Sequence, residues 1–195
     1  VATLGTWMDA PDVADLDDDA WLARARHDDA ARWPTYAAEH DATGLRAEAN
    51  VLRHRRHDAV LVRCRAGAAP RDLARLLHAA ATAGMPVHVS VDEASTLDAA
   101  EVVAAARRVD AHAPGFVVED DATLAARLPG LGQVVVRTLG ERSSDGAAAL
   151  RAACEEHGVR CDEAPVVMSG HVEFGRILRE QAISRTQHRY GRITG

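Results

Sequence analysis

Three cysteines are the side chains of this chain best suited to covalent chemistry, because a thiolate is a strong nucleophile. Cys64 and Cys161 end short apolar runs that predict strands, and Cys154 lies within a helical pattern. Aldehyde oxidation through a thiol, for example, requires a cysteine on a loop, a glutamate base elsewhere and amide donors for the oxyanion. Small buried thiols usually serve as packing residues. The cysteines therefore predict no catalytic nucleophile.

The closest metal-like spacing joins Cys154, His157 and Cys161. Cys154 and His157 would share one helix face, and Cys161 follows the next turn. A structural zinc ion requires four ligands, and no fourth candidate lies nearby in the sequence. His54 and His57 would point to opposite faces of an extended segment. The sequence therefore predicts no metal site.

The glycines do not form a dinucleotide-binding fingerprint, which must follow a strand and open a helix. Gly130-Leu131-Gly132 precedes a predicted strand, and the turn after Cys64 offers only Gly67-Ala68-Ala69-Pro70. The chain contains no lysine, so all 23 of its basic residues are arginine. This composition excludes a P-loop lysine and a Schiff-base lysine within these residues. We expect no bound cofactor and no catalytic residue in this chain.

Composition predicts one folded domain. The 195 residues are 47% hydrophobic and carry a net charge of −6, which argues against a nucleic-acid binder. An odd number of widely spaced cysteines favours reduced thiols and a cytoplasmic location. No apolar run approaches the roughly 20 residues of a membrane-spanning helix, and the N-terminus does not resemble a signal peptide. The missing Met and the abrupt ends suggest a piece excised from a longer protein.

Apolar runs alternate with helical patterns along the middle of the chain. The predicted strands are 60–64, 87–91, 116–118, 134–136 and 159–161. The helical patterns lie at 70–84, between Ser95 and Ala106, at 120–128 and at 144–157. Pro70 opens the first of these helices and Gly84 ends it, and Ser95 with Asp98 predicts a cap for the second. This alternation predicts an α/β fold, a Rossmann-like three-layer domain with a mainly parallel sheet.

Two further segments flank this domain, which we place at 45–165. Residues 1–44 predict an N-terminal helical arm that lays Trp21, Trp33 and Tyr36 on another surface. Pro34 predicts a kink or a restart of that helix at Trp33.

Residues 166–195 predict an extended C-terminal tail or flap. We interpret 177–188 as extended, although its pattern also permits a helix. Such a tail would add its unpaired backbone groups to another sheet, or would form an edge strand of the same domain.

Polar motifs near both ends resemble a known family. Residues 44–53 and 179–191 resemble the extreme C-terminal region of actinobacterial-type bifunctional enzymes in which proline dehydrogenase is fused to L-glutamate γ-semialdehyde dehydrogenase (proline utilization A). Glu48-Ala49-Asn50-Val51-Leu52-Arg53-His54-Arg55 looks like the start of their noncatalytic aldehyde-dehydrogenase-superfamily domain. The terminal motif corresponds to Leu178-Arg179-Glu180-Gln181-Ala182-Ile183-Ser184, and Gln187-His188-Arg189-Tyr190 replaces the glycine-rich ending of other members.

This resemblance implies a role inside a larger oxidoreductase. In the family, FAD serves proline oxidation, and the semialdehyde passes through a tunnel to an NAD-dependent domain. The chain would support the catalytic aldehyde dehydrogenase domain of the same polypeptide and close the tunnel. A homo-oligomer is a further possible partner. The expected interdomain contact residues are Arg179, Glu180, Gln181, Arg185, His188, Arg189 and Tyr190.

Two alternatives remain open from the residues. One is an independent small-ligand or regulatory α/β binding module, which requires a pocket at the carboxyl ends of the strands. The other is a self-contained hydrolase or transferase, but the chain has no G-x-S-x-G turn. We expect the chain alone to be inactive.

Overall fold

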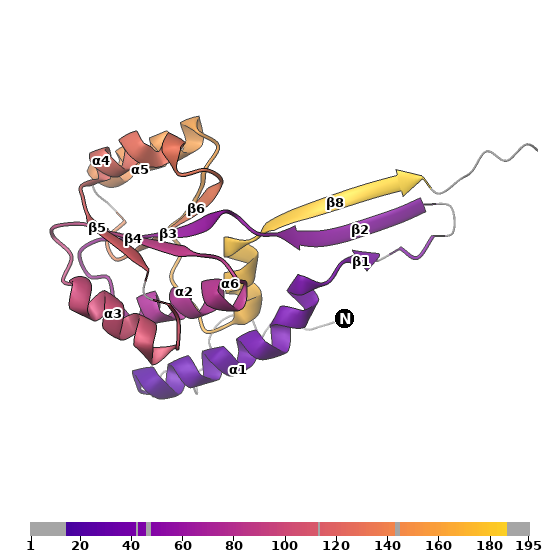
Figure 1. Cartoon of the computed structure of the whole chain (residues 1–195), viewed down its shortest axis with the longest axis horizontal. Coiled ribbons are helices and arrows are strands. Elements are labelled where there is room, and N and C mark those ends of the chain that lie inside the picture. Colours follow the sequence, from indigo (N-terminus) through magenta and orange to yellow (C-terminus); the bar gives the residue numbers. More distant parts are fainter. Residues whose placement is uncertain (1–14, 42, 46–47, 113, 143–144, 187–195) are drawn as a thin grey trace, which may run out of the picture.

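The five predicted apolar runs form one parallel sheet in the computed structural model, which describes residues 15–41, 43–45, 48–112, 114–142 and 145–186 (Figure 1). The strands are β3 (Ala59–Cys64), β4 (Val87–Val91), β5 (Gly115–Val118), β6 (Val134–Leu139) and β7 (Arg160–Asp162). Their spatial order is β5-β4-β3-β6-β7, so the chain builds outward from β3 in one direction and then in the other. β3 and β6 are buried at every position, which explains why both strands are mostly apolar.

Helices cover both faces of this sheet (Figure 1). One face packs against α2 (Pro70–Thr82) and α3 (Ala99–Arg108) through a large apolar cluster that includes Val60, Val62 and Leu76. The other face, with Leu61 and Val136, packs against α4 (Asp121–Arg127), the short 3₁₀ helix Leu128–Gly130 and α5 (Asp145–Glu156). The predicted α/β Rossmann-like three-layer fold is therefore confirmed. Among the described residues, no helix is long and apolar enough to cross a bilayer.

The N-terminal segment forms one helix, α1 (Asp18–Ala37), and the predicted restart at Trp33 is wrong. Pro34 lies in the last turn, so the helix loses one backbone bond there and only three helical residues follow the proline. Trp33 and Tyr36 each pack their rings against Phe174, at centroid distances of 5.2 and 5.3 Å. These contacts hold the last turn, and the aromatic face lies on the core of this same chain.

The cap of α3 also differs from the prediction. Asp98 accepts a bond from the Glu101 amide at 2.9 Å, and the Glu101 carboxylate accepts one from the Asp98 amide. Ser95 instead accepts a bond from the Leu97 amide. The capping box therefore begins three residues later than predicted, because a carboxylate also suits the positive end of the helix.

A second, smaller sheet projects from the body (Figure 1). It comprises β1 (His40–Asp41), β2 (Glu48–Arg55) and β8 (Arg179–Thr186), and α6 (Gly170–Ile177) leads into β8. β2 and β8 form a long antiparallel pair, which we call the ribbon.

The extended prediction for the tail is confirmed for Arg179–Thr186, whereas Ile177 ends a helix and residues 187–188 lie outside the described residues. β8 does not join the large sheet, since β2 is its partner. In the described part of the chain, the outer edge of β8 has no neighbouring strand.

Candidate functional site

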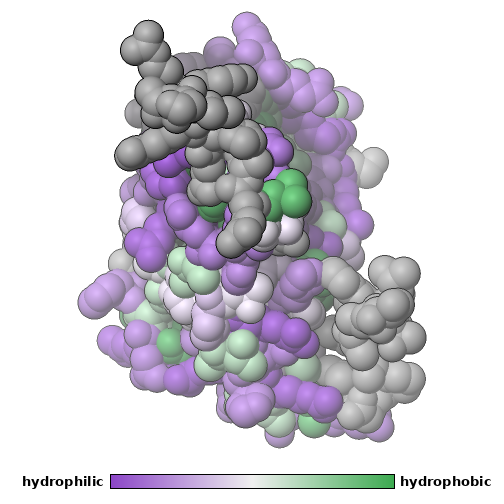
Figure 2. All heavy atoms as spheres, turned by 90° about the vertical axis from the view of Figure 1, so that its right-hand side faces the viewer, coloured by the Kyte–Doolittle hydropathy of each residue, from purple (hydrophilic) through white to green (hydrophobic). Residues whose placement is uncertain are grey.

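Four of the predicted contact residues, Arg179, Glu180, Gln181 and Arg185, lie in β8 and are exposed. The other three, His188, Arg189 and Tyr190, lie outside the described residues. The role of all seven in contacting another domain stays a prediction. Figure 2, which looks onto the ribbon side of the molecule, shows a largely hydrophilic surface around the residues drawn in grey.

The register of the ribbon gathers arginines on one of its faces. Residues directly opposite each other share a face of an antiparallel pair, and side chains alternate along each strand. Arg55 pairs with Arg179, Arg53 with Gln181, Val51 with Ile183 and Ala49 with Arg185. These eight residues form what we call the basic face of the ribbon. The opposite face carries His54 and Glu180.

One arginine of the basic face already has partners within the chain. Arg53 donates from Nε to Gln181 Oε1 at 2.8 Å and pairs with Glu39 at 2.8 Å. By contrast, no described residue forms a hydrogen bond or ion pair with the side chain of Arg55, Arg179 or Arg185. Since Arg55 and Arg179 are like charges placed directly opposite each other, they weaken the ribbon unless an anion lies between them.

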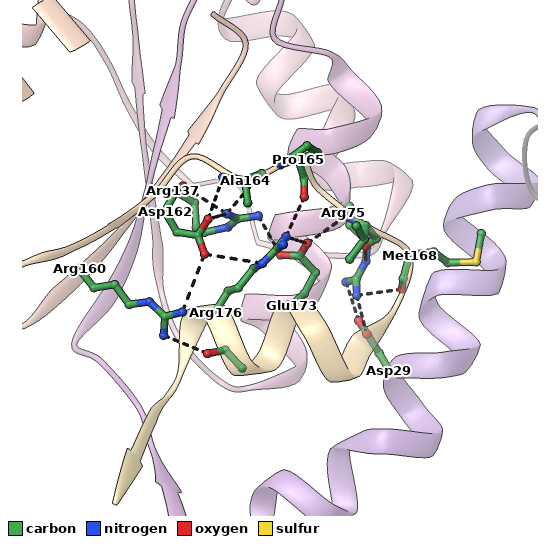
Figure 3. Close-up of polar contacts among 12 residues, drawn as sticks. Asp29, Arg75, Arg137, Arg160, Asp162, Ala164, Pro165, Met168, Glu173 and Arg176 are labelled. Carbon is green, nitrogen blue, oxygen red and sulfur yellow. Dashed lines mark hydrogen bonds and ion pairs between the residues drawn. The ribbon is translucent and has the colours of Figure 1, made fainter. Parts of the chain in front are cut away.

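Buried ion pairs attach α6 to the carboxyl edge of the large sheet (Figure 3). They thereby also fix the start of β8. Arg137 of β6 is fully buried and bonds Asp162 at 2.8 Å and Glu173 of α6 at 3.0 Å. Glu173 is also fully buried and accepts bonds from the Val167 amide at 2.9 Å and from Arg176 at 3.1 Å. Both carboxylate oxygens of Glu173 are therefore used, which compensates for the burial of its charge.

A second buried pair joins α1 to the same region (Figure 3). Arg75 of α2 binds both oxygens of Asp29 at 2.8 Å, and both side chains are fully buried. Burial raises the pKa of Asp29 to about 6, although the Arg75 charge partly opposes this shift. Arg75 also donates to the carbonyls of Val167 and Met168, each at 3.2 Å. Helix α6 therefore begins against α1, and only Leu178 separates its end from β8.

The carboxyl ends of β3 and β6 mark the point where open α/β sheets bind ligands. Here the two loops are bonded to each other: the Arg65 amide donates to the Leu139 carbonyl at 3.0 Å, and the Glu141 amide donates to the Ala66 carbonyl at 2.9 Å. Gly140 has φ +87, and an added Cβ would lie 2.8 Å from the Arg65 carbonyl oxygen, so only glycine fits this approach. A cavity of about 400 Å³ lies beside the loops.

The cations at this edge are neutralised by the chain's own carboxylates. Arg63 of β3 is fully buried and bonds Asp92 at 2.6 Å and Asp121 at 2.8 Å. Arg65 bonds Asp121 at 3.3 Å and Glu163 at 3.2 Å. An anionic ligand would have to displace these internal partners and would find the charges already compensated.

All three cysteines lie in regular elements, namely β3, α5 and β7. Cys64 is buried, and burial raises the pKa of its thiol to about 12. Cys154 is buried in α5, and Cys161 is half-buried in β7. Within the described ranges, no group of three or more His, Cys, Asp or Glu side chains is arranged to hold a metal ion.

Sequence reasoning missed the buried charges that position the ribbon. Arg63 and Arg137 adjoin runs of valine, and a charged residue in a strand that is otherwise apolar indicates a buried ion pair. Nothing in the local sequence indicates their partners, since Glu173 lies 36 residues from Arg137.

Comparisons with known proteins identify similar solved structures but no matching sequence family. No family model matches the sequence, and a search of curated proteins gives no match. The chain is similar to a solved structure of Proline Utilization A (PutA) from Corynebacterium freiburgense, with a TM-score of 0.54 and 24% sequence identity. The match covers 91% of this chain and 14% of that chain. This similarity shows a shared fold, and the chain spans a small part of that protein's length.

Proposed function

We propose that this chain is the noncatalytic C-terminal domain of a bifunctional enzyme that converts proline to glutamate. In that enzyme it would support the NAD-dependent glutamate semialdehyde dehydrogenase domain and close the tunnel that carries the semialdehyde. NAD and FAD would be bound by other domains of the parent polypeptide. The similarity to a proline utilization A structure and the resemblance of both ribbon strands to that family support this assignment.

The observation that carries the proposal is the pairing of Arg55 with Arg179 on the basic face of the ribbon. Like charges in direct opposition destabilise a strand pair, so their presence indicates a function outside the isolated fold. A carboxylate from another domain, placed between the two guanidinium groups, would turn the repulsion into two charge-assisted bonds. The free outer edge of β8 would add backbone bonds to the same contact.

Rigid attachment of the ribbon supports a docking role. The buried partners of Glu173 and Asp29 hold α6 against the sheet and α1, so β8 starts from a fixed position. A fixed strand loses little conformational freedom when a partner binds. The internal neutralisation of Arg63 and Arg65 further supports a role without a bound cofactor.

The test uses the parent enzyme, whose reading frame should encode a flavin-dependent barrel and a catalytic aldehyde dehydrogenase. We expect Arg179→Glu, and more strongly deletion of residues 179–195, to slow proline-dependent NADH formation several-fold and to release semialdehyde into solution. Flavin reduction by proline should be unchanged, because it does not require a sealed route between sites.

Arg107→Glu is the matched control, since Arg107 is an exposed arginine of α3, away from the ribbon. Equal loss of flavin reduction and NADH formation would indicate unfolding instead of a leaking tunnel. Unchanged coupled turnover in the deletion variant would contradict the proposal.

The second candidate function is an independent small-ligand or regulatory module, which the cavity of about 400 Å³ at the carboxyl ends of β3 and β6 favours. Calorimetric titration of the isolated chain with NAD and with adenine nucleotides separates the two functions. Saturable binding at micromolar concentrations would support the module. Semialdehyde-dependent NADH formation by the isolated chain would contradict its assignment as noncatalytic.

A further inference from the structure

Strand β5 is an edge of the large sheet that exposes apolar side chains. It pairs with β4 on one side, and no described strand lies on its other side. Val117 is 39% exposed and Val118 is 53% exposed, and they are two of the three large apolar side chains exposed in the described part of the chain. Phe116 beside them is half-buried. The edge therefore offers unpaired backbone groups and apolar side chains to a partner.

Two other edge strands carry charges that β5 lacks. Soluble proteins usually protect an edge strand with charged side chains or with a covering element. At the opposite end of the large sheet, β7 carries Arg160 and Asp162, which bond to α6. In the ribbon, β8 carries Arg179, Glu180 and Arg185. None of the four residues of β5 is charged, so its open edge indicates a contact surface.

The sequence of β5 is self-complementary in an antiparallel pair. In a two-fold symmetric dimer the same strand of both copies meets, and residues opposite each other share a face of the joined sheet. A pair centred on Val117 places Val117 opposite its own counterpart and Phe116 opposite Val118 of the second copy. Phe116 and Val118 share a face, since their neighbours in β4 both belong to the large apolar cluster on the α2 side. Apolar side chains therefore meet at the centre of this pair.

The two ends of β5 also complement each other. A cavity of about 670 Å³ adjoins its amino end, and the lining includes Met85, Pro86, His88, Asp110, His112 and Pro114. The carboxylate of Asp110 is paired with Arg26 at 3.2 Å. Asp120, which is exposed, follows the carboxyl end of β5. In an antiparallel pair this carboxylate lies near the amino end of the second copy, where imidazoles supply hydrogen-bond donors.

We propose that two copies of this chain associate by antiparallel pairing of their β5 strands, which joins the two large sheets into one. Backbone bonds along the edge and burial of Val117 and Val118 favour the association. The contact involves one short strand of each copy, so the dimer is weak and forms at high protein concentration. β5 and the ribbon lie at opposite ends of the molecule, so the dimer leaves the basic face open (Figure 1).

Sedimentation equilibrium of the 195-residue chain tests this association. We expect the average mass to rise from 20.8 kDa toward twice that value as the protein concentration increases. Val117→Lys and Val117→Glu should each remain monomeric, because the substituted position faces its own counterpart and like charges would meet there. An equimolar mixture of the two variants should restore the dimer, since lysine then faces glutamate.

Control variants locate the contact. Leu45→Lys changes an apolar residue that is 52% exposed and lies outside β5, and it should associate as the wild type does. Val118→Asp, at the most exposed of the apolar positions in β5, should be monomeric and replaces a Val117 variant that fails to fold in circular-dichroism melts.

Three results would overturn the proposal. The first is a wild-type chain that stays monomeric at every soluble concentration. The second is a dimer that survives the charged substitutions in β5 or that is lost in Leu45→Lys. The third is a mixture of folded Val117→Lys and Val117→Glu chains that stays monomeric, because the two positions would then not face each other.

Discussion

Asp29 and Arg75 show how a single buried pair can make this fold sensitive to pH. The two side chains are fully buried and bonded in bidentate geometry, yet burial still raises the pKa of Asp29 to about 6. Removing a carboxylate from water costs free energy that the arginine offsets only in part. As pH falls, the folded state therefore takes up a proton at Asp29 at a higher pH than the unfolded chain does.

This gives a first prediction, with its sign. Because the folded pKa of about 6 exceeds the ordinary 3.8, the contribution of Asp29 to stability is greatest at acid pH and is lost as pH rises through about 6. Relative to Asp29→Asn, the wild-type chain should lose roughly 1–2 kcal/mol of unfolding free energy between about pH 5 and about pH 7. Urea denaturation across this range measures it, with Asp110→Asn as the exposed control. Parallel pH profiles of wild type and Asp29→Asn would refute the prediction.

Leu76 tests the packing of α2 on the large sheet. Its side chain is 1% exposed and belongs to the same apolar cluster as Val60 and Val62 of β3. Leu76→Ala should lower the free energy of unfolding by about 2–5 kcal/mol, through lost transfer energy and a residual cavity. Leu45→Ala, at a leucine that is 52% exposed, should change it by less than about 0.5 kcal/mol. Equal denaturant midpoints for the two variants would mean that α2 is placed wrongly.

At the level of elements, α6 determines where the ribbon begins. Its first turn packs against α1, where the Gly170 amide donates to Asp28 at 2.7 Å and its Cα faces Asp29. Its middle is bonded to the sheet through Glu173, and its end leads into β8 after one residue. A shift of this helix would therefore move the whole ribbon.

Two glycines of α6 provide a matched pair of tests. At Gly170 an added Cβ would lie 3.1 Å from the Asp29 Cα and closer still to its carboxylate, whereas at Gly175 it would meet only Tyr36 Oη at 4.0 Å. Gly170→Ala should therefore destabilise the chain by roughly 1–3 kcal/mol. Gly175→Ala should be neutral or stabilise it by up to about 1 kcal/mol, because alanine favours a helix. Thermal melts of both variants check the contrast, and a stable Gly170→Ala protein would show that α1 and α6 are not in close contact.

Among the described residues, the buried arginines of the body are all paired with carboxylates, whereas two arginines that face each other on the ribbon are not. At the carboxyl edge of the sheet, the arginines Arg63, Arg65 and Arg137 are each bonded to carboxylates of this chain. On the ribbon, Arg55 and Arg179 face each other and no described carboxylate pairs with them. This contrast is why we propose the ribbon, and not the usual ligand position of an α/β sheet, as the surface for a partner.

We expect Arg179→Glu to have opposite effects on the stability of the isolated chain and on the activity of the parent enzyme. In the isolated chain, Arg179→Glu should stabilise the ribbon by roughly 0.2–1 kcal/mol, because it faces Arg55 with an opposite charge. The gain should shrink in high salt, since both side chains are exposed. In the parent enzyme the same change should impair coupled turnover. Denaturant melts at two salt concentrations measure the first effect, and a loss of stability in the isolated chain would contradict the register of the ribbon.

Most elements of the body could be predicted from the sequence, because each depends on residues close together in the chain. Apolar runs predicted β3, β4, β5, β6 and β7, and Pro70 with Gly84 predicted where α2 begins and ends. Predictions from the local sequence were less reliable where contacts with other residues changed the outcome. Phe174 holds the helical turn around Pro34, and Asp98 with Glu101 displaces Ser95 as the cap of α3.

The ribbon and the buried charges were decided by the tertiary structure. Extended character at 179–186 is a local property, but its pairing with β2 joins residues about 130 positions apart. A register shift of one residue would place Arg179 and Arg185 on the opposite face from Arg55. Arg137 is conspicuous in its sequence, yet Glu173 becomes its partner only after α6 folds back onto the sheet. The periodicity of the sequence indicates on which face of an element a side chain lies. Which strand or charged residue becomes its partner depends on how distant elements pack together.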